Sequence, residues 1–598
     1  MAWESRQYGA AAALTTGQPT EVATALRNAY NQLGAQGLLL GMGPIRVHGK
    51  TARAYFTASI DLGRGGPPWT YQGHFTLRRH ASGWMVEWSP AVIVPGLGTG
   101  DRLAVLTTVP QRASLVDSSG KKLILRSPVV QVGVRPGRVP DPIATATGLA
   151  RVTGLASSEA DQMVGQIRAA SPNTFLELIQ LSPRRFQHLS AALGKVPHLT
   201  HRWVTKRLFR SAVPAITGQV GTEAAKELIN EGVPYRPGTT VGLSGLQQAY
   251  QATLAGTPTT EVVVQNSSGH LVKVLKRWPG QNGSSVRTTI NLAVQRAAQQ
   301  AVTGTGFSSA VVAVQARTGR VLAVAMHTAA GMPGVDPLNG RYHPGQAFTI
   351  VPTAALLSKD RTFGANSQIP CSQQPSLIGG QNFTNIPPVP SLGKPRFGPD
   401  FAHACSTAFT ELSVLLNPAD LATAATQFGI GVQWQLPLKP SPFVGNIQKP
   451  GSLGEKAADS IGTGTVLVSP LDMALAAGVV ESGSWHRPSV VTRPSGPTLT
   501  SGDEVPLRLK GQVINQLQQL MAGTVKSGAA QAAWLSGERL YGQVGSAPLM
   551  GHPKLRTIWF VGFRGGVAFA VVALSPYSAF DPAVQVARDF AERLPAHI

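Results

Sequence analysis

The sequence has few cysteines, few acidic side chains and no long apolar run. Only two of its 598 residues are cysteines, Cys371 and Cys405. This sparse usage excludes a small disulfide-rich scaffold and fits either an exported chain with one disulfide or a chain with two inert thiols. No apolar run reaches the roughly 18 residues that a membrane-spanning helix needs. The first residues also lack the charged and apolar regions of a signal peptide.

Acidic residues are outnumbered, with 29 Asp and Glu against 52 Lys and Arg, and the formal net charge is +23. One interpretation is attraction to polyanions such as nucleic acid, anionic lipid or anionic wall polymers. The basic residues are dispersed, which favours a generally basic protein instead. Because no nucleic-acid-binding motif is present, we expect no nucleic-acid partner. His198 and His201 lack the spacing of a zinc site, and we expect no metal and no cofactor.

What is present indicates a globular chain of several domains. Hydrophobic residues make up 43% of the chain and charged residues 14%, so extensive disorder is excluded. A length of 598 residues favours about three domains. The fold class that we predict is multidomain α+β.

The first predicted domain covers residues 1–108. The stretch "TEVATALRNAYNQL" has the periodicity of an amphipathic helix. In "WTYQGHFTL" the apolar residues Trp69, Tyr71, Phe75 and Leu77 alternate with polar ones, which predicts a sheet with one buried face. We interpret the aromatic residues as core, with a ligand pocket as the alternative.

The second predicted domain covers residues 109–280. "RASLVDSSGKKLILR" predicts two strands joined by a Ser-Ser-Gly turn. We expect helices in "SSEADQMVGQIRAA", "TFLELIQL" and "GLSGLQQAYQATLAG". Nothing in this part has catalytic spacing, so we interpret it as an elongated structural or docking domain.

The third predicted domain covers residues 281–598. Asn291 is placed as the N-cap of a helix in "LAVQRAAQQAV". "SAVVAVQARTGRVLAVAM" predicts a hairpin with its turn at Thr318 and Gly319, and "WFVGFRGGVAFAVVAL" predicts two buried strands around a Gly-Gly turn. Helices packed on an antiparallel sheet make this an α+β domain.

Six segments, in order, resemble a class B penicillin-binding protein over essentially the whole chain. "WMVEWSPAVIVPGLGTGDRL" is similar to the end of the NTF2-like N-terminal domain of the methicillin-resistance type. "PQRASLVDSSGKKL" and "GLSGLQQAYQATLAGTP" resemble parts of the pedestal, or dimerisation, domain. "TTINLAVQRAAQQAV", "SSAVVAVQARTGRVLAVA" and "GTGTVLVSPLDMALAAGVVESG" resemble parts of the β-lactamase-like transpeptidase domain. The resemblance implies a D,D-transpeptidase fold acting on peptidoglycan.

The family works through three motifs, and all three depart from the pattern here. Ser-x-x-Lys supplies a nucleophile and an amine one helical turn apart, Ser-x-Asn adds a hydroxyl and an amide, and Lys-Thr-Gly lies on a strand beside the substrate. The corresponding stretches here read "PGQAFT", "ACSTAF" and "GQVGSA". We expect these positions to line the substrate pocket: Gln346, Thr349, Ala404, Ser406, Gln543, Val544, Gly545 and Ser546.

These substitutions predict that the chain has no catalytic residue and is inactive as a transpeptidase. Gln346 cannot be acylated as a serine is, and Thr349 supplies no amine. A helix starting near Gln346 would contain Pro352, which should bend it. "SLGK" (391–394) and "KSG" (526–528) fit parts of the motifs, but the first lies between prolines and the second follows a helix.

The resemblance also implies a location and partners. We expect an extracytoplasmic protein associated with the cell envelope, with an anchor upstream of this chain. We expect Cys371 and Cys405 to form a disulfide. The interpretation that we favour is a non-catalytic scaffold or regulator of peptidoglycan synthesis, which binds wall peptides, anionic wall polymers, or cell-division or elongation proteins. The alternatives are an active D,D-transpeptidase that uses Thr349 or Ser406, and a binding module for anionic wall polymers.

Overall fold

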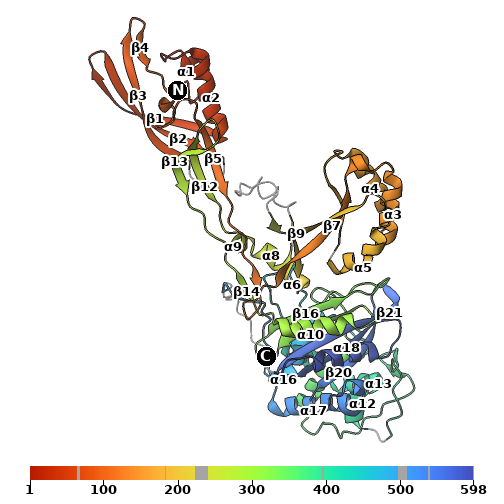
Figure 1. Ribbon diagram of the computed structural model, residues 1–598. Helices are drawn as coiled ribbons and strands as arrows, with labels where there is room; N and C mark the ends of the chain where they lie inside the picture. The colour runs from red at the N-terminus through yellow and green to blue at the C-terminus, as the bar shows by residue number, and fades with distance from the viewer. Residues whose placement is uncertain are drawn as a thin grey trace. The chain divides into compact units, whose positions relative to one another are not determined.

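The structure, a computed structural model, describes residues 1–63, 68–155, 157–181, 183–221, 240–393, 396–495, 508–536 and 539–596 (Figure 1). Its contacts divide the chain into two compact units. Unit 1 comprises Met1–Ser114 and Val220–Val286, and unit 2 comprises Leu115–Gln219 and Arg287–Ile598. The middle part of the chain, predicted as one pedestal domain, therefore contributes residues to both units.

Unit 1 is built from two stretches of chain that are separated in the sequence by part of unit 2. Its elements are α1 (Tyr8–Ala12), α2 (Pro19–Leu33), β1 (Gly37–His48), β2 (Thr51–Asp61), β3 (Trp69–His80), β4 (Gly83–Val86), η1 (Pro90–Val92), β5 (Arg102–Thr108), β10 (Val220–Gly221), β11 (Val241–Gly242), α8 (Gly245–Ala249), α9 (Gln251–Ala255), β12 (Thr259–Gln265) and β13 (Leu271–Trp278). The sheets are β1-β2-β3-β4, β13-β12-β5 and β10-β11, and each is antiparallel where its pairing is described.

The core of unit 1 is built from the predicted helix and the predicted alternating strand. Val22, Leu26 and Leu33 of α2 pack with Phe56 of β2 and Trp69 of β3 in one hydrophobic cluster. Trp69 is 2% exposed. Trp69, Tyr71 and Phe75 therefore serve packing, as predicted, whereas Trp84 is exposed. The expected helix at 245–255 is present as two short helices, α8 and α9, separated at Tyr250.

The first part of unit 2 runs to Gln219. Its elements are β6 (Leu115–Val116), β7 (Ile124–Val134), η2 (Pro136–Arg138), α3 (Pro142–Thr153), α4 (Ser157–Ala169), β8 (Leu176–Leu181), α5 (Pro183–Leu193), β9 (Thr200–Ser211) and α6 (Pro214–Thr217). The helix predicted in "TFLELIQL" is wrong, because this stretch is β8 and pairs antiparallel with β7. A short apolar run is compatible with a helix and with a strand. The pairing with β7 makes this one a strand.

The rest of unit 2 alternates helices with strands. Its elements are β14 (Val286–Thr288), α10 (Leu292–Thr303), β15 (Ser309–Gln315), β16 (Arg320–His327), η3 (Gly345–Thr349), α11 (Ile350–Lys359), β17 (Ser376–Ile378), β18 (Gln381–Phe383), α12 (Phe397–Ala402), α13 (Ser406–Leu412), η4 (Ser413–Leu415), α14 (Pro418–Gln427), α15 (Leu453–Ser460), α16 (Pro470–Ser482), β19 (Val491–Arg493), α17 (Gly511–Ser527), η5 (Gln531–Ala533), β20 (Tyr541–Leu549), β21 (His552–Arg564), β22 (Val567–Ser575) and α18 (Asp581–Glu592).

A five-stranded antiparallel sheet, in the order β16-β15-β22-β21-β20, organises this part of the chain (Figure 1). Helices α10 and α18 pack on each other and against one face of the sheet. On the other face, Gly478 of α16 lies against Ala316 and Ala568. The predicted α+β class is confirmed, and β20 forms one edge of the sheet.

Local signals in the sequence explain several of these elements. The side chain of Asn291 accepts hydrogen bonds from the amides of Ala293 and Val294, so the predicted N-cap of α10 is confirmed. The turn between β21 and β22 uses Gly565 and Gly566, both with positive φ, as a tight hairpin requires. Among the described residues, no helix has both the length and the apolar character needed to cross a bilayer.

Candidate functional site

Two glycines allow the short helix η3 to approach the edge strand β20 closely. Gly345 has φ +56°, and a Cβ there would lie 2.7 Å from the backbone nitrogen of Ser546. A Cβ on Gly545 would lie 2.3 Å from the carbonyl oxygen of Pro344. Neither position tolerates a side chain without a shift of backbone. The first and third expected motif stretches are therefore in direct contact.

The predicted helix start differs from the one observed. Residues Gly345–Thr349 form a 3-10 helix, and the α-helix α11 begins at Ile350 with Thr349 as its N-cap. Pro352 is the third residue of α11, where an amide has no acceptor within the helix. Because the α-helix does not start near Gln346, the condition for the predicted bend at Pro352 is not met, and this proline lies in a first turn that accommodates it.

Gln346 connects three separate segments through its side-chain amide. Its Nε2 donates to the hydroxyl of Ser406 at 2.8 Å and to the carbonyl of Ile386 at 3.2 Å. Its Oε1 accepts a hydrogen bond from the backbone amide of Ser546 at 2.9 Å. The side chain is only 4% exposed. Both N–H groups and the oxygen of this amide are therefore used within the protein.

Thr349 and Gln543 form a second buried contact below Gln346. The Thr349 hydroxyl donates to the carbonyl of Gln346 at 2.7 Å. Gln543 Nε2 donates to Thr349 Oγ1 at 3.0 Å and to the carbonyl of Phe401 at 3.0 Å. Both side chains are fully buried. Among the described residues, no lysine donates a hydrogen bond to Gln346, Thr349, Ser406 or Gln543.

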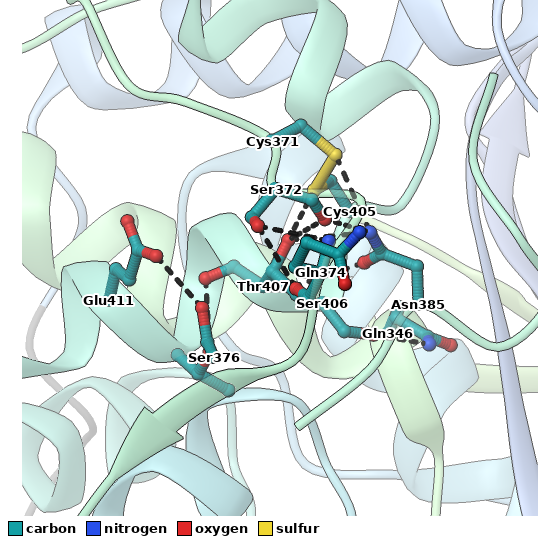
Figure 2. Close-up of a disulfide and its surroundings, with 11 residues drawn as sticks. Gln346, Cys371, Ser372, Gln374, Ser376, Asn385, Cys405, Ser406, Thr407 and Glu411 are labelled. Atoms are coloured by element: carbon teal, nitrogen blue, oxygen red, sulfur yellow. Dashed lines mark hydrogen bonds between the residues drawn. A yellow bond between two sulfur atoms is a disulfide. The ribbon is translucent and has the colours of Figure 1, made fainter. Parts of the chain in front are cut away.

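A disulfide lies directly beside Ser406. Cys371 and Cys405 are bonded with an S–S distance of 2.04 Å and a Cα–Cα distance of 6.0 Å, and Cys405 immediately precedes α13 (Figure 2). The two cysteines are 34 residues apart in the sequence. The segment that they close includes Ile386, whose carbonyl accepts from Gln346. The disulfide therefore restrains one of the three segments that Gln346 joins.

Hydrogen bonds of Asn385 and Thr407 also hold the segment between the two cysteines in place (Figure 2). Asn385 Nδ2 donates to the carbonyl of Ser372 at 2.9 Å, and its Oδ1 accepts from the amide of Thr407 at 3.1 Å. The Thr407 hydroxyl donates to the carbonyl of Ser372 at 3.0 Å. Neither Asn385 nor Ile386 was predicted from the sequence, since their roles depend on contacts across the loop.

The remaining expected site residues have different positions. Ala404 and Val544 belong to the hydrophobic core cluster, and Ala404 has a left-handed backbone with φ 55°. The hydroxyl of Ser546 accepts from Nε of Arg556 at 2.8 Å. Sequence reasoning missed Arg556, although β21 runs directly beside β20. Of the eight positions, the structure joins Gln346, Thr349, Ser406, Gln543 and Ser546 by hydrogen bonds and packs Gly545 against η3.

A buried carboxyl group lies in α12, the short helix that precedes Ser406 in the sequence. Asp400 in α12 is 1% exposed, and neither of its carboxylate oxygens has a hydrogen-bond partner among the described residues. Burial raises the pKa of Asp400 to about 7. The backbone carbonyl of Asp400 accepts from the amide of Cys405 at 2.9 Å. The helix α12 therefore contains both this carboxyl group, whose pKa is close to 7, and Phe401, whose carbonyl accepts a hydrogen bond from Gln543.

Other candidate groups add no chemistry to this site. Among the described residues, no group of three or more His, Cys, Asp or Glu side chains is placed to hold a metal ion. In "KSG", Lys526 and Ser527 are the last residues of α17, as the sequence indicated. In "SLGK", Lys394 lies outside the described residues.

Three protein-family models match successive parts of the chain. They are the NTF2-like N-terminal transpeptidase domain over residues 1–101, the Penicillin-binding Protein dimerisation domain over 107–288, and the Penicillin binding protein transpeptidase domain over 309–590. The helices and antiparallel sheets described above fit these matches. The fold and the matches together define a multidomain protein with a transpeptidase domain at its C-terminal end.

Known proteins are similar to this chain along much of its length. "Penicillin-binding protein 3" of Bacillus subtilis is 22% identical over 543 residues, which is 80% of this chain and 75% of that protein. "Peptidoglycan D,D-transpeptidase MrdA" of Haemophilus influenzae is 24% identical over 38% of this chain and 36% of its own length. The Escherichia coli K12 protein of the same name is 23% identical over 40% and 38%. The chain belongs to the class B penicillin-binding proteins.

Proposed function

We propose that this chain is a member of the peptidoglycan-synthesis machinery that does not form an acyl-enzyme and acts by binding, as a scaffold or regulator. The observation that carries the proposal is the state of Gln346. This residue stands where the family pattern has its serine, and all its hydrogen-bonding atoms are used by Ile386, Ser406 and Ser546. The side chain therefore holds the three segments together and offers no nucleophile.

The surroundings of Gln346 support the same reading. Thr349 and Gln543 stand at the family's two lysine positions and bond to each other as neutral groups. Loss of both nucleophile and base costs about six powers of ten in turnover in comparable hydrolases. Remaining contacts in the pocket cannot offset such a loss.

An unconventional nucleophile has less support. The hydroxyl of Thr349 is fully buried and donates to a backbone carbonyl, with Gln543 rather than an amine beside it. The hydroxyl of Ser406 is 1% exposed and accepts from Gln346. Neither hydroxyl contacts a base among the described residues. The alternative of a module for anionic wall polymers rests on the net charge of +23 alone.

We propose the cell envelope as the place of action, and wall peptides, anionic wall polymers or division and elongation proteins as partners. The experiment is release of D-alanine from a pentapeptide donor. We expect none above a heat-denatured sample of the same chain, whereas steady release would overturn the proposal. Pull-downs against wall polymers and against division or elongation proteins then separate polymer binding from scaffolding.

A further inference from the structure

A polar cleft of about 280 Å³ lies in unit 2, outside the cluster around Gln346. Its lining comes from two stretches, the segment just before η3 and the loop after α14. The lining residues are Asn339, Arg341, Gln433, Trp434, Gln435, Ser441, Pro442, Phe443 and Val444. Its volume is near the lower end for ligand sites, which suits a small molecule or the end of a longer one.

The cleft is held in place by one backbone contact between the two stretches and by one contact within the loop after α14. The amide of Phe443 donates to the carbonyl of Leu338 at 3.0 Å, and the amide of Gly431 donates to the carbonyl of Val444 at 3.1 Å. The guanidinium of Arg341 lies 4.9 Å from the centre of the Phe443 ring. Attraction to the ring restricts the guanidinium, while its N–H groups, which lie in its own plane, can still donate hydrogen bonds.

The charge and hydrogen-bonding groups of the cleft favour a negative ligand. Arg341 is the one charged residue of the lining, and among the described residues it has no ion pair or hydrogen bond. The nearby carboxylate of Asp336 accepts from the backbone amides of Leu338 and Asn339 and is not part of the lining. Arg341 therefore presents a free guanidinium fork in a cleft without a competing acid.

A second feature of the cleft is an apolar wall. Trp434 lines the cleft and is 4% exposed, and its indole nitrogen is closed to solvent. The side chain therefore contributes an aromatic surface to the cleft rather than a hydrogen-bond donor. Gln433 and Gln435, on either side of Trp434 in the sequence, are exposed.

From these features we infer that the cleft binds a small carboxylate, with Arg341 as the anchor of the carboxylate group and Trp434 as an aromatic wall beside it. A planar guanidinium matches a carboxylate in a bidentate pair. The inference rests on the proposed function, because a chain that acts by binding needs a ligand site apart from the occupied cluster at Gln346. Two wall components carry such a group: the C-terminus of a stem peptide and the lactyl group of a sugar acid.

The experiment measures binding of acetyl-D-alanyl-D-alanine, its C-terminal amide and N-acetylmuramic acid to the full chain by calorimetry. We expect at least one acid to bind with a Kd below about 5 mM, and which acid binds identifies the source. If the dipeptide acid binds, its amide should bind at least tenfold more weakly. Arg341→Gln should weaken the binding of either acid at least tenfold. Arg317→Gln, an exposed arginine at the β15–β16 turn, should change it less than twofold.

Trp434→Phe keeps most of the aromatic wall and removes a nitrogen that is closed to solvent, so it should change binding less than twofold. Failure of both acids to bind at about 10 mM, equal binding of the dipeptide acid and its amide, or an unchanged Kd in Arg341→Gln would overturn the inference. These outcomes are separate from a failure of the proposed function, which appears as D-alanine release and does not depend on Arg341.

Discussion

Gln543 Nε2 donates a hydrogen bond to the hydroxyl of Thr349 across 3.0 Å, although the two residues are 194 positions apart in the sequence. This contact joins the edge strand β20 to the end of η3. In the family pattern both positions carry lysines. Here two neutral side chains make a hydrogen bond that binds the strand to the helix.

Replacing Gln543 with Ala should destabilise the fold. The change removes the two hydrogen bonds that Nε2 donates and the two that Oε1 accepts in this fully buried side chain, and it leaves a cavity beside Thr349 and Phe401. We expect the free energy of unfolding to fall by roughly 2–4 kcal/mol, measured by chemical denaturation. The control is Gln512→Ala, an exposed position in the first turn of α17. Equal effects of the two changes would contradict a structural role for the Gln543 contact.

Replacing Gln346 with Ser should not restore acylation. The new hydroxyl would lie beside Thr349, which provides no amine to take its proton. We expect labelling by a fluorescent penicillin to stay at the level of Gln346→Ala, the matched variant without a hydroxyl. Strong labelling of Gln346→Ser alone would show that the missing lysine is not what prevents the reaction.

Reduction of the disulfide should loosen the segment that contains Ile386. The bond closes a loop with a sequence separation of 34 residues. The chain-entropy model gives roughly 3–4 kcal/mol for a loop of this size. We expect denaturation midpoints of the native chain to fall with a dithiol reductant, while those of a Cys371→Ala, Cys405→Ala variant stay constant. A native chain that is insensitive to complete reduction, verified by thiol titration, would refute this.

Stability should fall as the pH rises from about 4 to 7. Burial raises the pKa of Asp400 and that of Asp472 from 3.8 to about 7. In this range the folded state binds more protons than the unfolded state, so each group favours folding at low pH and this advantage is lost on deprotonation. Each carboxyl could contribute at most about 4 kcal/mol of this change.

Asp400→Asn should therefore flatten the dependence and stabilise the chain at pH 8 relative to the native protein. The measurement is urea denaturation at several pH values. Asp161→Asn, at an exposed position of α4, serves as the control and should leave the profile unchanged. If Asp400→Asn destabilises the chain at pH 8, then the carboxylate has a favourable partner in solution and the explanation by burial fails.

Local sequence signals predicted the elements better than the site. The cap at Asn291 and the turn at Gly565 and Gly566 depend on residues adjacent in the chain, and both were predictable. The strand at Leu176–Leu181 was missed because its pairing with β7 is not visible in its own residues. The positions around Gln346 were found by resemblance to a family.

The partners of those side chains could not be predicted in the same way. The bonds from Gln346 to Ile386 and Ser406, and from Arg556 to Ser546, connect residues brought together only by the tertiary fold. Likewise, no local pattern signalled the 3-10 form of Gly345–Thr349 or the close approach of Gly345 to Ser546.

Intact-protein mass spectrometry of the native chain after incubation with benzylpenicillin tests the absence of a nucleophile most directly. An active penicillin-binding protein in the same buffer shows that the drug is reactive. Because Gln346 is fully hydrogen-bonded and no lysine donates a hydrogen bond to Thr349 or Ser406 among the described residues, we predict that the mass remains that of the unmodified chain. A stable adduct with the mass of the ring-opened drug, mapped to Thr349, Ser406 or Ser546, would contradict the proposal.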